Sequence, residues 1–272
     1  MEFYREVEKN LIKKNRKELW SKFIKAIKDY NLIKENDKIM VCISGGKDSF
    51  ILAKLLQELK RHGQTKFEVG FVVMNPGYKE EVLKKIMDNA ALLNIPIEVF
   101  SNDIFKVSTS LNPTNPCYMC ARMRRGYLYD YAKSHGYNKI ALGHHYDDVI
   151  ETILMSVIYG GEFKTMLPKL KSKNFEGMEL IRPMYYIREK DIINFSKNNN
   201  LTFINCACSF TENNIEGKRK EIKNLIKELE KNNKYVPYNI FKSAEKVNLE
   251  TLLSYTKNDV IYDIYDDYDI MK

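Results

Sequence analysis

Short apolar runs alternate with amphipathic runs along most of this 272-residue chain. The apolar run 39–43 predicts a buried strand, and residues 50–59 after the next turn predict an amphipathic helix. The alternation continues to about residue 231, with strands predicted over 67–73, 97–100, 139–142 and 201–205, and helices over 80–93, 119–134, 149–158, 188–200 and 215–231. This order predicts an α/β fold with a Rossmann-like parallel sheet and helices on both faces.

The pattern also divides the chain into three parts. Residues 1–36 predict a helical N-terminal appendage, because Leu11, Leu19 and Phe23 recur near helical spacing. Residues 37–232 hold the alternating elements and predict the main domain, in which 159–183, rich in glycine and lysine, predict a long loop. Residues 233–272 are loose in pattern and predict a C-terminal extension with an acidic tail.

Composition narrows the class of protein. Hydrophobic residues make up 44% of the chain, enough for a sizeable core, and no apolar stretch approaches the roughly 20 residues that span a bilayer. The N-terminus lacks the layout of a signal peptide, so we expect a cytoplasmic protein with no membrane partner. The net charge is +8, although residues 251–272 carry five Asp and two Lys. A basic body suits a polyanionic partner such as RNA, but lysine-rich usage is also typical of an AT-rich genome.

The residues between the first predicted strand and helix form a candidate phosphate site. Their sequence is Ser44-Gly45-Gly46-Lys47-Asp48-Ser49, called the phosphate loop below. A strand, a glycine turn and a helix N-terminus gather backbone N–H groups around one point, and the glycines let the backbone approach a phosphate closely. The spacing is neither that of the Walker loop nor that of the dinucleotide fingerprint. We therefore predict a phosphate site of another type.

A second polar motif follows the strand predicted over 139–142. Gly143, His144 and His145 precede Asp147 and Asp148 at the start of a helix. Either carboxylate can cap this helix, and either can hold Mg²⁺ on nucleotide phosphates, because hard oxygen ligands suit this ion. Sequence neighbours seldom share one metal, so we expect the histidines to hydrogen-bond rather than to bind zinc.

Five cysteines in a chain without an export signal favour metal or redox chemistry over a disulfide framework. Cys117 and Cys120 form a C-x-x-C pair at a helix start, and Cys206 and Cys208 follow a later predicted strand. The spacing leaves three alternatives: a four-cysteine zinc site, a redox pair, and a [4Fe–4S] cluster with three protein ligands and one open iron. Cys42, inside the first strand, is most simply a core residue.

Basic residues follow the C-x-x-C pair directly. Guanidinium groups beside a nucleotide site can hold phosphate or an RNA backbone, whereas an ordinary basic helix face has no such role. The predicted basic strip consists of Arg122, Arg124, Arg125, Lys164, Lys169 and Lys171, with the helix from Lys218 to Lys227 nearby.

Taken together, the motifs resemble those of the tRNA 2-thiocytidine synthetase family of PP-loop ATP pyrophosphatases. The matching segments are S-G-G-K-D-S, P-C-Y-M-C-A-R-M-R-R-G, L-G-H-H-Y-D-D-V-I-E-T and I-Y-G-G-E-F-K-T-M-L-P-K-L, within about residues 36–230. The resemblance implies an adenine nucleotide alpha hydrolase-like sheet, ATP and Mg²⁺, and a [4Fe–4S] cluster bound by three cysteines. It also implies an enzyme that thiolates an anticodon-loop cytidine of tRNA.

The resemblance assigns roles residue by residue. The implied ATP-binding residues are Ser44, Gly45, Gly46, Lys47, Asp48, Ser49, Met74, Gly143 and Asp147. The implied catalytic residues are Lys47, Asp48, Arg125 and Asp148, and the implied cluster ligands are Cys117, Cys120 and Cys206. The late motif is C-x-x-C in the family and C-x-C here, so Cys208 stays open as the third ligand.

By the same resemblance, a base carbonyl oxygen attacks the α-phosphate of ATP and sulfur then replaces the oxygen, giving 2-thiocytidine or a 2- or 4-thiouridine. The implied partners are tRNA, a sulfur donor (sulfide or a cysteine desulfurase) and a second copy of the chain in a homodimer. Three alternatives stay open: a persulfide-using sulfurtransferase without a cluster, an amine-adding tRNA ligase of the lysidine type, and a non-catalytic RNA-binding protein. The cysteines argue against the ligase, and the complete phosphate loop argues against the non-catalytic protein.

Overall fold

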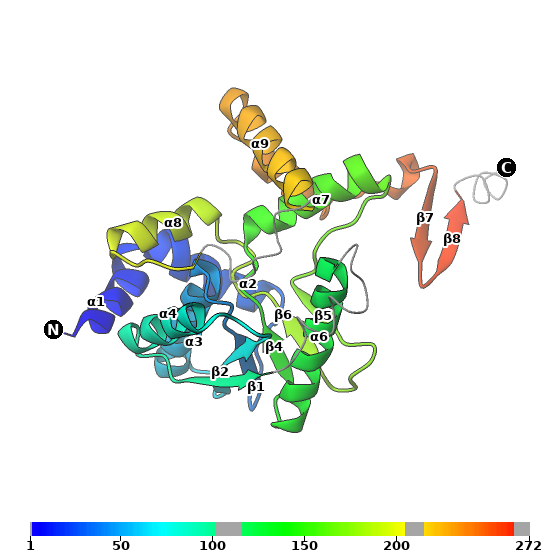
Figure 1. The fold of residues 1–272 in the computed structure, drawn as a ribbon. Coiled ribbons are helices and arrows are strands. Elements are labelled where there is room, and N and C mark those ends of the chain that lie inside the picture. Colours follow the sequence, from blue (N-terminus) through cyan, green and yellow to red (C-terminus); the bar gives the residue numbers. More distant parts are fainter. Residues whose placement is uncertain (1, 102–115, 205–214, 264–272) are drawn as a thin grey trace.

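The computed structural model describes residues 2–101, 116–204 and 215–263, without the side chains of residues 116–122 and 215–216. Its centre is a six-stranded sheet in the order β3–β2–β1–β4–β6–β5 (Figure 1). The strands are β1 (Lys38–Cys42), β2 (Glu68–Asn75), β3 (Ile97–Ser101), β4 (Lys139–Ala141), β5 (Lys169–Lys171) and β6 (Glu179–Ile181). All neighbouring pairs are parallel except β5 with β6, so the predicted parallel sheet is confirmed.

The strand order determines where a ligand can bind. β1 pairs with β2 on one side and β4 on the other, so that Val41 lies between Phe71 and Ala141. Because β2 and β3 extend the sheet in one direction and β4 and β6 in the other, the order switches between β1 and β4. Ligands of such sheets bind beyond the carboxyl ends of the strands at this switch point. The phosphate loop follows β1 and the segment 142–148 follows β4, so both motifs lie there.

Helices cover both faces of the sheet, as predicted (Figure 1). α3 (Lys47–His62), α4 (Glu80–Leu92) and α8 (Glu189–Asn198) pack on the face that carries Ile39 and Val41. α6 (Pro116–Ser134) packs on the opposite face, which carries Met40. Successive residues of β1 therefore enter two separate cores, and both cores hold the strand ends in place.

The N-terminal residues pack into the core on the α3 side. They form α1 (Phe3–Lys9), two π-helical turns (Asn10–Lys14 and Arg16–Trp20) and α2 (Ser21–Asp29). Glu8 pairs with the fully buried Lys54 of α3 at 2.6 Å, and Lys54 also donates to the carbonyl oxygen of Leu93 at 2.9 Å. A buried charge depends on its partner, so this pair ties α1 to α3. The boundaries at residues 36 and 232 stay predictions.

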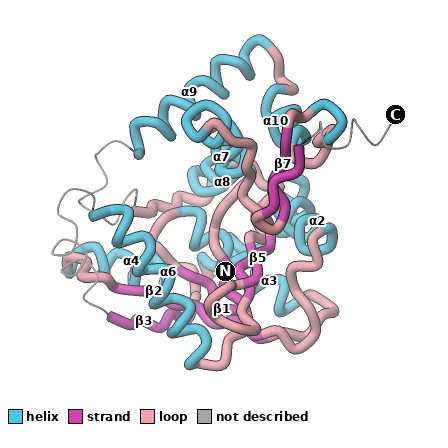
Figure 2. The backbone as a smooth tube through the Cα atoms, turned by 90° about the vertical axis from the view of Figure 1, so that its right-hand side faces the viewer, coloured by secondary structure: helices cyan, strands magenta, loops and turns pink. Residues whose placement is uncertain are grey.

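The C-terminal elements pack on α7 (Tyr146–Gly160). α9 (Ile215–Asn232) and α10 (Val236–Ser243) flank α7 and share an apolar cluster with it (Figure 2). After a 3-10 turn (Leu249–Thr251), β7 (Ser254–Lys257) and β8 (Val260–Asp263) form a hairpin that projects from the other described residues (Figure 1). No helix in the described ranges is both long enough and apolar enough to cross a membrane.

Two predicted segments differ in the structure. Residues 201–204 form no strand, and Phe203 stacks on Phe50 of α3. The last predicted residue, 205, lies outside the described residues. The segment predicted as a long loop over 159–183 contains β5 and β6. Strands of three residues are too short for a periodic signal, and their pairing in the sheet, β6 with β4 and β5 with β6, stabilises them.

Candidate active site

The phosphate loop folds as a tight turn between β1 and α3. Gly45 has a φ of +88°, which favours glycine, and a Cβ there would lie 2.9 Å from Cγ1 of Ile86. Ser49 fixes the turn from within, because its hydroxyl donates to the carbonyl oxygen of Gly46 at 2.9 Å and accepts from the N–H of Ser44 at 3.2 Å. α3 starts directly after Gly46. Its first N–H groups lack partners within the helix, so they are available to an anion.

A cavity of 360 Å³, called the nucleotide cavity below, lies at the carboxyl ends of β1, β2 and β4. The walls combine apolar strand residues with converging charged groups, as in many small-molecule sites. Arg124, His144 and Arg219 are among its charged or titratable lining residues. The predicted site residues that line it are Ser44, Asp48, Ser49, Met74, Gly143 and Asp148.

Gly143 lies directly against the start of α3. A Cβ at this position would lie 3.0 Å from the backbone carbon of Asp48 and 3.0 Å from the backbone nitrogen of Ser49. Backbone atoms cannot give way as a flexible side chain can, so only glycine lets the two motifs meet without moving the phosphate loop. Gly143 thus has a packing role at the wall of the nucleotide cavity.

We expect Gly143→Ala to weaken ATP binding, because the added methyl group displaces the phosphate loop. Overpacking of this kind costs about 1–3 kcal/mol, so the Kd for ATP should rise about tenfold, as measured by titration calorimetry. Gly126→Ala in α6 is the matched control, since nothing lies within 4 Å of its added Cβ, and it should bind ATP as the wild type does. An unchanged Kd in Gly143→Ala would contradict this packing role.

Asp48 presents a carboxylate oxygen that has no hydrogen-bond donor among the described residues. Its Oδ1 is buried, with Nε2 of His145 at 3.9 Å, while Nζ of Lys47 lies 3.1 Å from Oδ2. Burial raises the pKa of Asp48, although the nearby His145 and Lys47 oppose this shift. A buried oxygen of this kind is well placed to coordinate a hard cation.

Asp148 caps α7 and also faces the nucleotide cavity. Its Oδ2 accepts from the N–H of His145 at 2.9 Å, and its own N–H donates to Nδ1 of His145 at 3.3 Å, which closes a capping box. Its Oδ1 accepts from Nη2 of Arg219 at 2.7 Å. Burial opposes ionisation, but His145 and Arg219 hold the pKa of Asp148 below its usual value. The carboxylate is therefore charged at neutral pH.

Asp147 lies outside the nucleotide cavity. It accepts from Nε of Arg188 at 3.0 Å and from the N–H of Glu189 at 2.6 Å, and it lines a separate cavity of 290 Å³ between α7, α8 and α9. The structure thus brings Asp48 and Asp148 together but places Asp147 elsewhere. An ATP-binding role of Asp147 stays a prediction.

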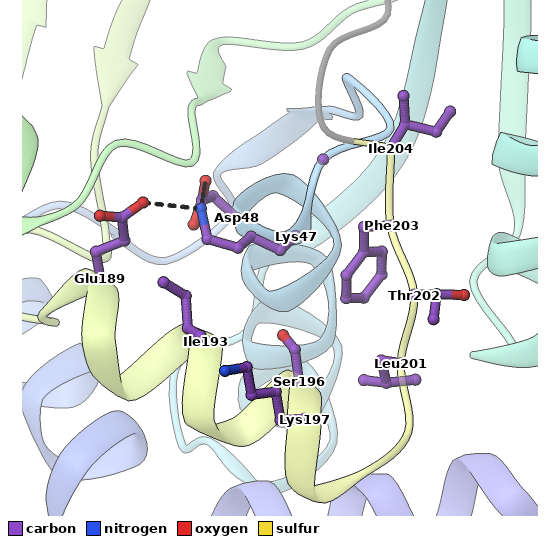
Figure 3. Close-up of a pocket in the computed structure, with 11 residues that line it drawn as sticks. Lys47, Asp48, Glu189, Ile193, Ser196, Lys197, Leu201, Thr202, Phe203 and Ile204 are labelled. Carbon is purple, nitrogen blue, oxygen red and sulfur yellow. Dashed lines mark hydrogen bonds and ion pairs between the residues drawn. The ribbon is translucent and has the colours of Figure 1, made fainter. Parts of the chain in front are cut away.

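A further cavity of 510 Å³ lies on the other side of the start of α3, between α8 and residues 201–204 (Figure 3). Lys47 pairs there with Glu189 at 3.2 Å, and Lys223 of α9 pairs with the same carboxylate. Burial opposes ionisation of Glu189, but Lys223 and Lys47 lower its pKa to about 2. No strand of the sheet lines this cavity, so the switch-point rule favours the nucleotide cavity for ATP.

His144 brings a neutral imidazole to the nucleotide cavity. Burial lowers the pKa of His144 to about 4, and the nearby Arg182 and Arg219 act in the same direction. Its Nδ1 is buried without a partner in the described part of the chain. At neutral pH His144 can therefore donate and accept hydrogen bonds, which is the role expected for it from the sequence.

α6 brings one of the predicted arginines to the nucleotide cavity. Arg124 lines the cavity, and its Nη2 lies 3.5 Å from the hydroxyl of Tyr78. Arg125 is exposed and is absent from the cavity lining. A catalytic role of Arg125 stays a prediction, and Arg124 has the position that such a role requires.

The predicted cluster ligands lie outside the described side chains. Cys117 and Cys120 belong to the backbone of α6, while Cys206 and Cys208 fall within 205–214. Two described residues near these cysteines in the sequence lie at the site. Arg124, four residues after Cys120, lines the nucleotide cavity. Ile204, two residues before Cys206, donates its N–H to the carbonyl oxygen of Gly45 at 3.2 Å.

Known proteins match this chain over most of its length. Residues 15–230 match the PP-loop domain family. The chain is 37% identical over 236 residues to a tRNA-cytidine(32) 2-sulfurtransferase of Coxiella burnetii, which covers 85% of this chain and 90% of that protein. It is 39% identical over 241 residues to tRNA-cytidine(32) 2-sulfurtransferase 1 of Francisella philomiragia, with coverages of 87% and 92%. The chain belongs to the tRNA 2-thiocytidine synthetase family of PP-loop proteins. The resemblance seen in the sequence is thereby confirmed.

A solved structure shares the fold of this 2-thiocytidine synthetase family member. The U34-tRNA thiolase NcsA from Methanococcus maripaludis, solved with its [4Fe–4S] cluster, superposes with a TM-score of 0.68. The two chains are 23% identical, and the match covers 88% of this chain and 80% of that one. This likeness confirms the α/β PP-loop fold.

The sequence motifs of this family member do not point to the cationic partners of the site. Arg219 lies in a run of basic residues, and Arg188 directly precedes α8, so nothing local singles them out. The helical phase narrows the choice in α9, because Lys218 and Arg219 share the side of the buried Ile222 and Ile226, whereas Lys220 does not.

Proposed function

We propose that this protein is an ATP-dependent tRNA thiolase that adenylates a base carbonyl and then replaces the oxygen with sulfur. The observation that carries the proposal is the convergence of the phosphate loop, Asp48 and Asp148 on one cavity at the switch point of the sheet. The names of the relatives from Coxiella burnetii and Francisella philomiragia support a cytidine of tRNA as the target. The PP-loop match supports ATP as the activating substrate.

In the first step, residues of the nucleotide cavity would bind ATP and stabilise the leaving pyrophosphate. The N–H groups at the start of α3 and the hydroxyls of Ser44 and Ser49 suit the phosphates. Asp48 and Asp148 fit Mg²⁺, because Asp48 offers an oxygen without a donor in the described residues and hard oxygens suit this ion. Arg124 lines the same cavity and would neutralise charge as the base oxygen attacks the α-phosphate.

In the second step, sulfur displaces AMP. Hydrosulfide forms a bond to the activated ring carbon, the carbon–oxygen bond breaks, and AMP leaves with the oxygen. The proton of hydrosulfide is released to water. The protein must hold the adenylated base away from bulk water, since hydrolysis would only restore the starting base.

Cys117, Cys120 and Cys206 fit a [4Fe–4S] cluster by their donor chemistry, as three thiolates of which two lie three residues apart in α6. A bound cluster would supply an open iron that carries sulfide. Cys208 stays an alternative to Cys206 as the third ligand. The described neighbours of both segments lie at the nucleotide cavity and the phosphate loop, which supports a cluster close to ATP.

The basic strip is the proposed tRNA surface. Lys218, Lys220 and Lys227 of α9 are exposed, and Lys171 is exposed on β5. A sulfur donor (sulfide or a cysteine desulfurase), a homodimeric state and a cytoplasmic location complete the proposal.

Thiolation of unmodified tRNA tests this function. Oxygen-free protein is incubated with ATP, Mg²⁺, sulfide and tRNA, and the nucleosides are analysed by mass spectrometry. We expect 2-thiocytidine and AMP in equal amounts. Thiolation by iron-free protein that receives its sulfur from a cysteine desulfurase, with no free sulfide added, would favour the persulfide alternative, and an amine adduct would favour a ligase of the lysidine type.

A further inference from the structure

The inner face of α9 carries charge where an amphipathic helix would be apolar. Two buried isoleucines, Ile222 and Ile226, supply its apolar contacts. The charged residues on this face pair with residues of α7 and α8 near the site: Arg219 with Asp148 and Glu151, Lys223 with Glu189, and Glu230 with Arg188. The docking of α9 therefore depends on the charges at the active site.

Arg219 is the residue of α9 that lines the nucleotide cavity. Its Nη2 donates to Oδ1 of Asp148 at 2.7 Å, and its Nε donates to Oε2 of Glu151 at 2.8 Å. Burial opposes the charge of Arg219, but Asp148 and Glu151 raise its pKa, so the guanidinium is charged. A guanidinium has five N–H donors in a planar fork, which suits carboxylate and phosphate equally well.

Arg219 and a divalent cation would compete for the same oxygen of Asp148. Its Oδ2 accepts the hydrogen bond of the capping box, so Oδ1 is the oxygen available to a cation. Arg219 already donates a hydrogen bond to this Oδ1. A divalent ion at Oδ1 would lie beside the positive guanidinium of Arg219, and the two charges would repel each other unless Arg219 moves to a negatively charged group. The phosphates of ATP would bring that negative charge into the same cavity.

We propose that Arg219 binds a nucleotide phosphate and exchanges partners when ATP and Mg²⁺ enter. In the nucleotide-free protein it neutralises Asp148; with nucleotide bound, it pairs with a phosphate oxygen and Asp148 is released to the cation. The Nε bond to Glu151 anchors the guanidinium, so the exchange requires only a small rotation of its outer end. This inference rests on the proposed function, because it names a further ligand at that same nucleotide site.

This exchange of partners would couple ATP binding to tRNA binding. The inner face of α9 would bind the nucleotide through Arg219, while its outer face carries the exposed Lys220 and Lys227 of the proposed tRNA surface. Phosphate binding by Arg219 stabilises the docked position of α9, so ATP should tighten tRNA binding. Linkage requires that tRNA tighten ATP binding by the same factor.

Calorimetric titration of the full chain with a non-hydrolysable ATP analogue and Mg²⁺ tests the proposal. A charge-assisted hydrogen bond is worth about 1.5–3 kcal/mol, so Arg219→Gln should raise the Kd about 10- to 100-fold. Arg219→Lys, which keeps the charge, should recover part of this loss. Lys220→Gln is the matched control, because it removes one positive charge from the exposed face of the same helix and should leave the Kd for the analogue unchanged.

Binding of tRNA with and without the analogue completes the test. In the wild type the analogue should tighten tRNA binding; in Arg219→Gln this gain should disappear, whereas Lys220→Gln should weaken tRNA binding and keep the gain. A wild-type Kd for the analogue in Arg219→Gln would overturn the proposal, even if the wild type thiolates tRNA. If Arg219→Gln loses helix content by circular dichroism, Glu151→Met decides instead: it keeps Arg219 and a side chain of similar length but removes the oxygen that accepts from Nε of Arg219, and an unchanged Kd there would contradict the anchored exchange. A wild type that binds neither ATP nor tRNA would instead contradict the proposed function.

Discussion

Replacement of Asp48 by asparagine is expected to abolish thiolation, with turnover falling by about a thousandfold or more. The buried Oδ1 of Asp48 has no hydrogen-bond donor among the described residues, and Asp48 lines the cavity that Asp148 also lines. An amide has the same shape but no negative charge, so it cannot hold a divalent cation on the phosphates. The first chemical step, attack on the α-phosphate, should therefore fail.

AMP formation in the presence of tRNA measures this step separately from sulfur delivery. Asp147→Asn is the matched control, because it makes the same change at a carboxylate outside the nucleotide cavity, paired with Arg188. We expect Asp147→Asn to retain most of its turnover. Near wild-type AMP formation in Asp48→Asn would contradict the assignment of Asp48, and a greater loss in Asp147→Asn would move the cation site to Asp147.

The central part of the fold and the site follows from local sequence. A strand, two glycines and a helix start can meet in few ways, so the phosphate loop was predictable from six residues. A shared edge for the two polar motifs was also predictable, since both follow strands of one parallel sheet, whereas the switch point itself depends on the strand order. The positive φ of Gly45 agrees with the predicted glycine turn of the phosphate loop, whereas the close approach of Gly143 to Asp48 was not predicted.

The remaining features depend on residues that are distant in sequence. Arg219 lies 71 residues from Asp148 in the chain, and its helical phase separates it from Lys220 but not from Lys218. The sequence likewise offered two adjacent carboxylates, Asp147 and Asp148, and only the packing of α7 turns one toward the nucleotide cavity and the other toward Arg188. Adjacent residues on a helix point in different directions, so such a choice requires the phase of the helix relative to the sheet.

Loss of any one cluster ligand should abolish thiolation. We expect Cys117→Ala, Cys120→Ala and Cys206→Ala each to lack the brown colour and most of the iron of the wild type, which should contain about four irons and four sulfides per chain when purified without oxygen. Their ATP binding should persist, because the nucleotide cavity is built from other residues. Iron and sulfide analysis, with the visible spectrum, measures the change directly and separates it from loss of ATP binding.

Cys42→Ala is the control for these variants. Burial raises the pKa of the Cys42 thiol to about 12, so in the absence of a bound metal it stays protonated at neutral pH. The variant should keep its iron, with at most a modest loss of stability in the core. Cys208→Ala decides the third ligand: if it loses iron while Cys206→Ala keeps it, the assignment of Cys206 is wrong. Wild-type protein that thiolates tRNA with zinc or no metal would contradict the cluster itself, and the cysteines would then act through persulfide chemistry.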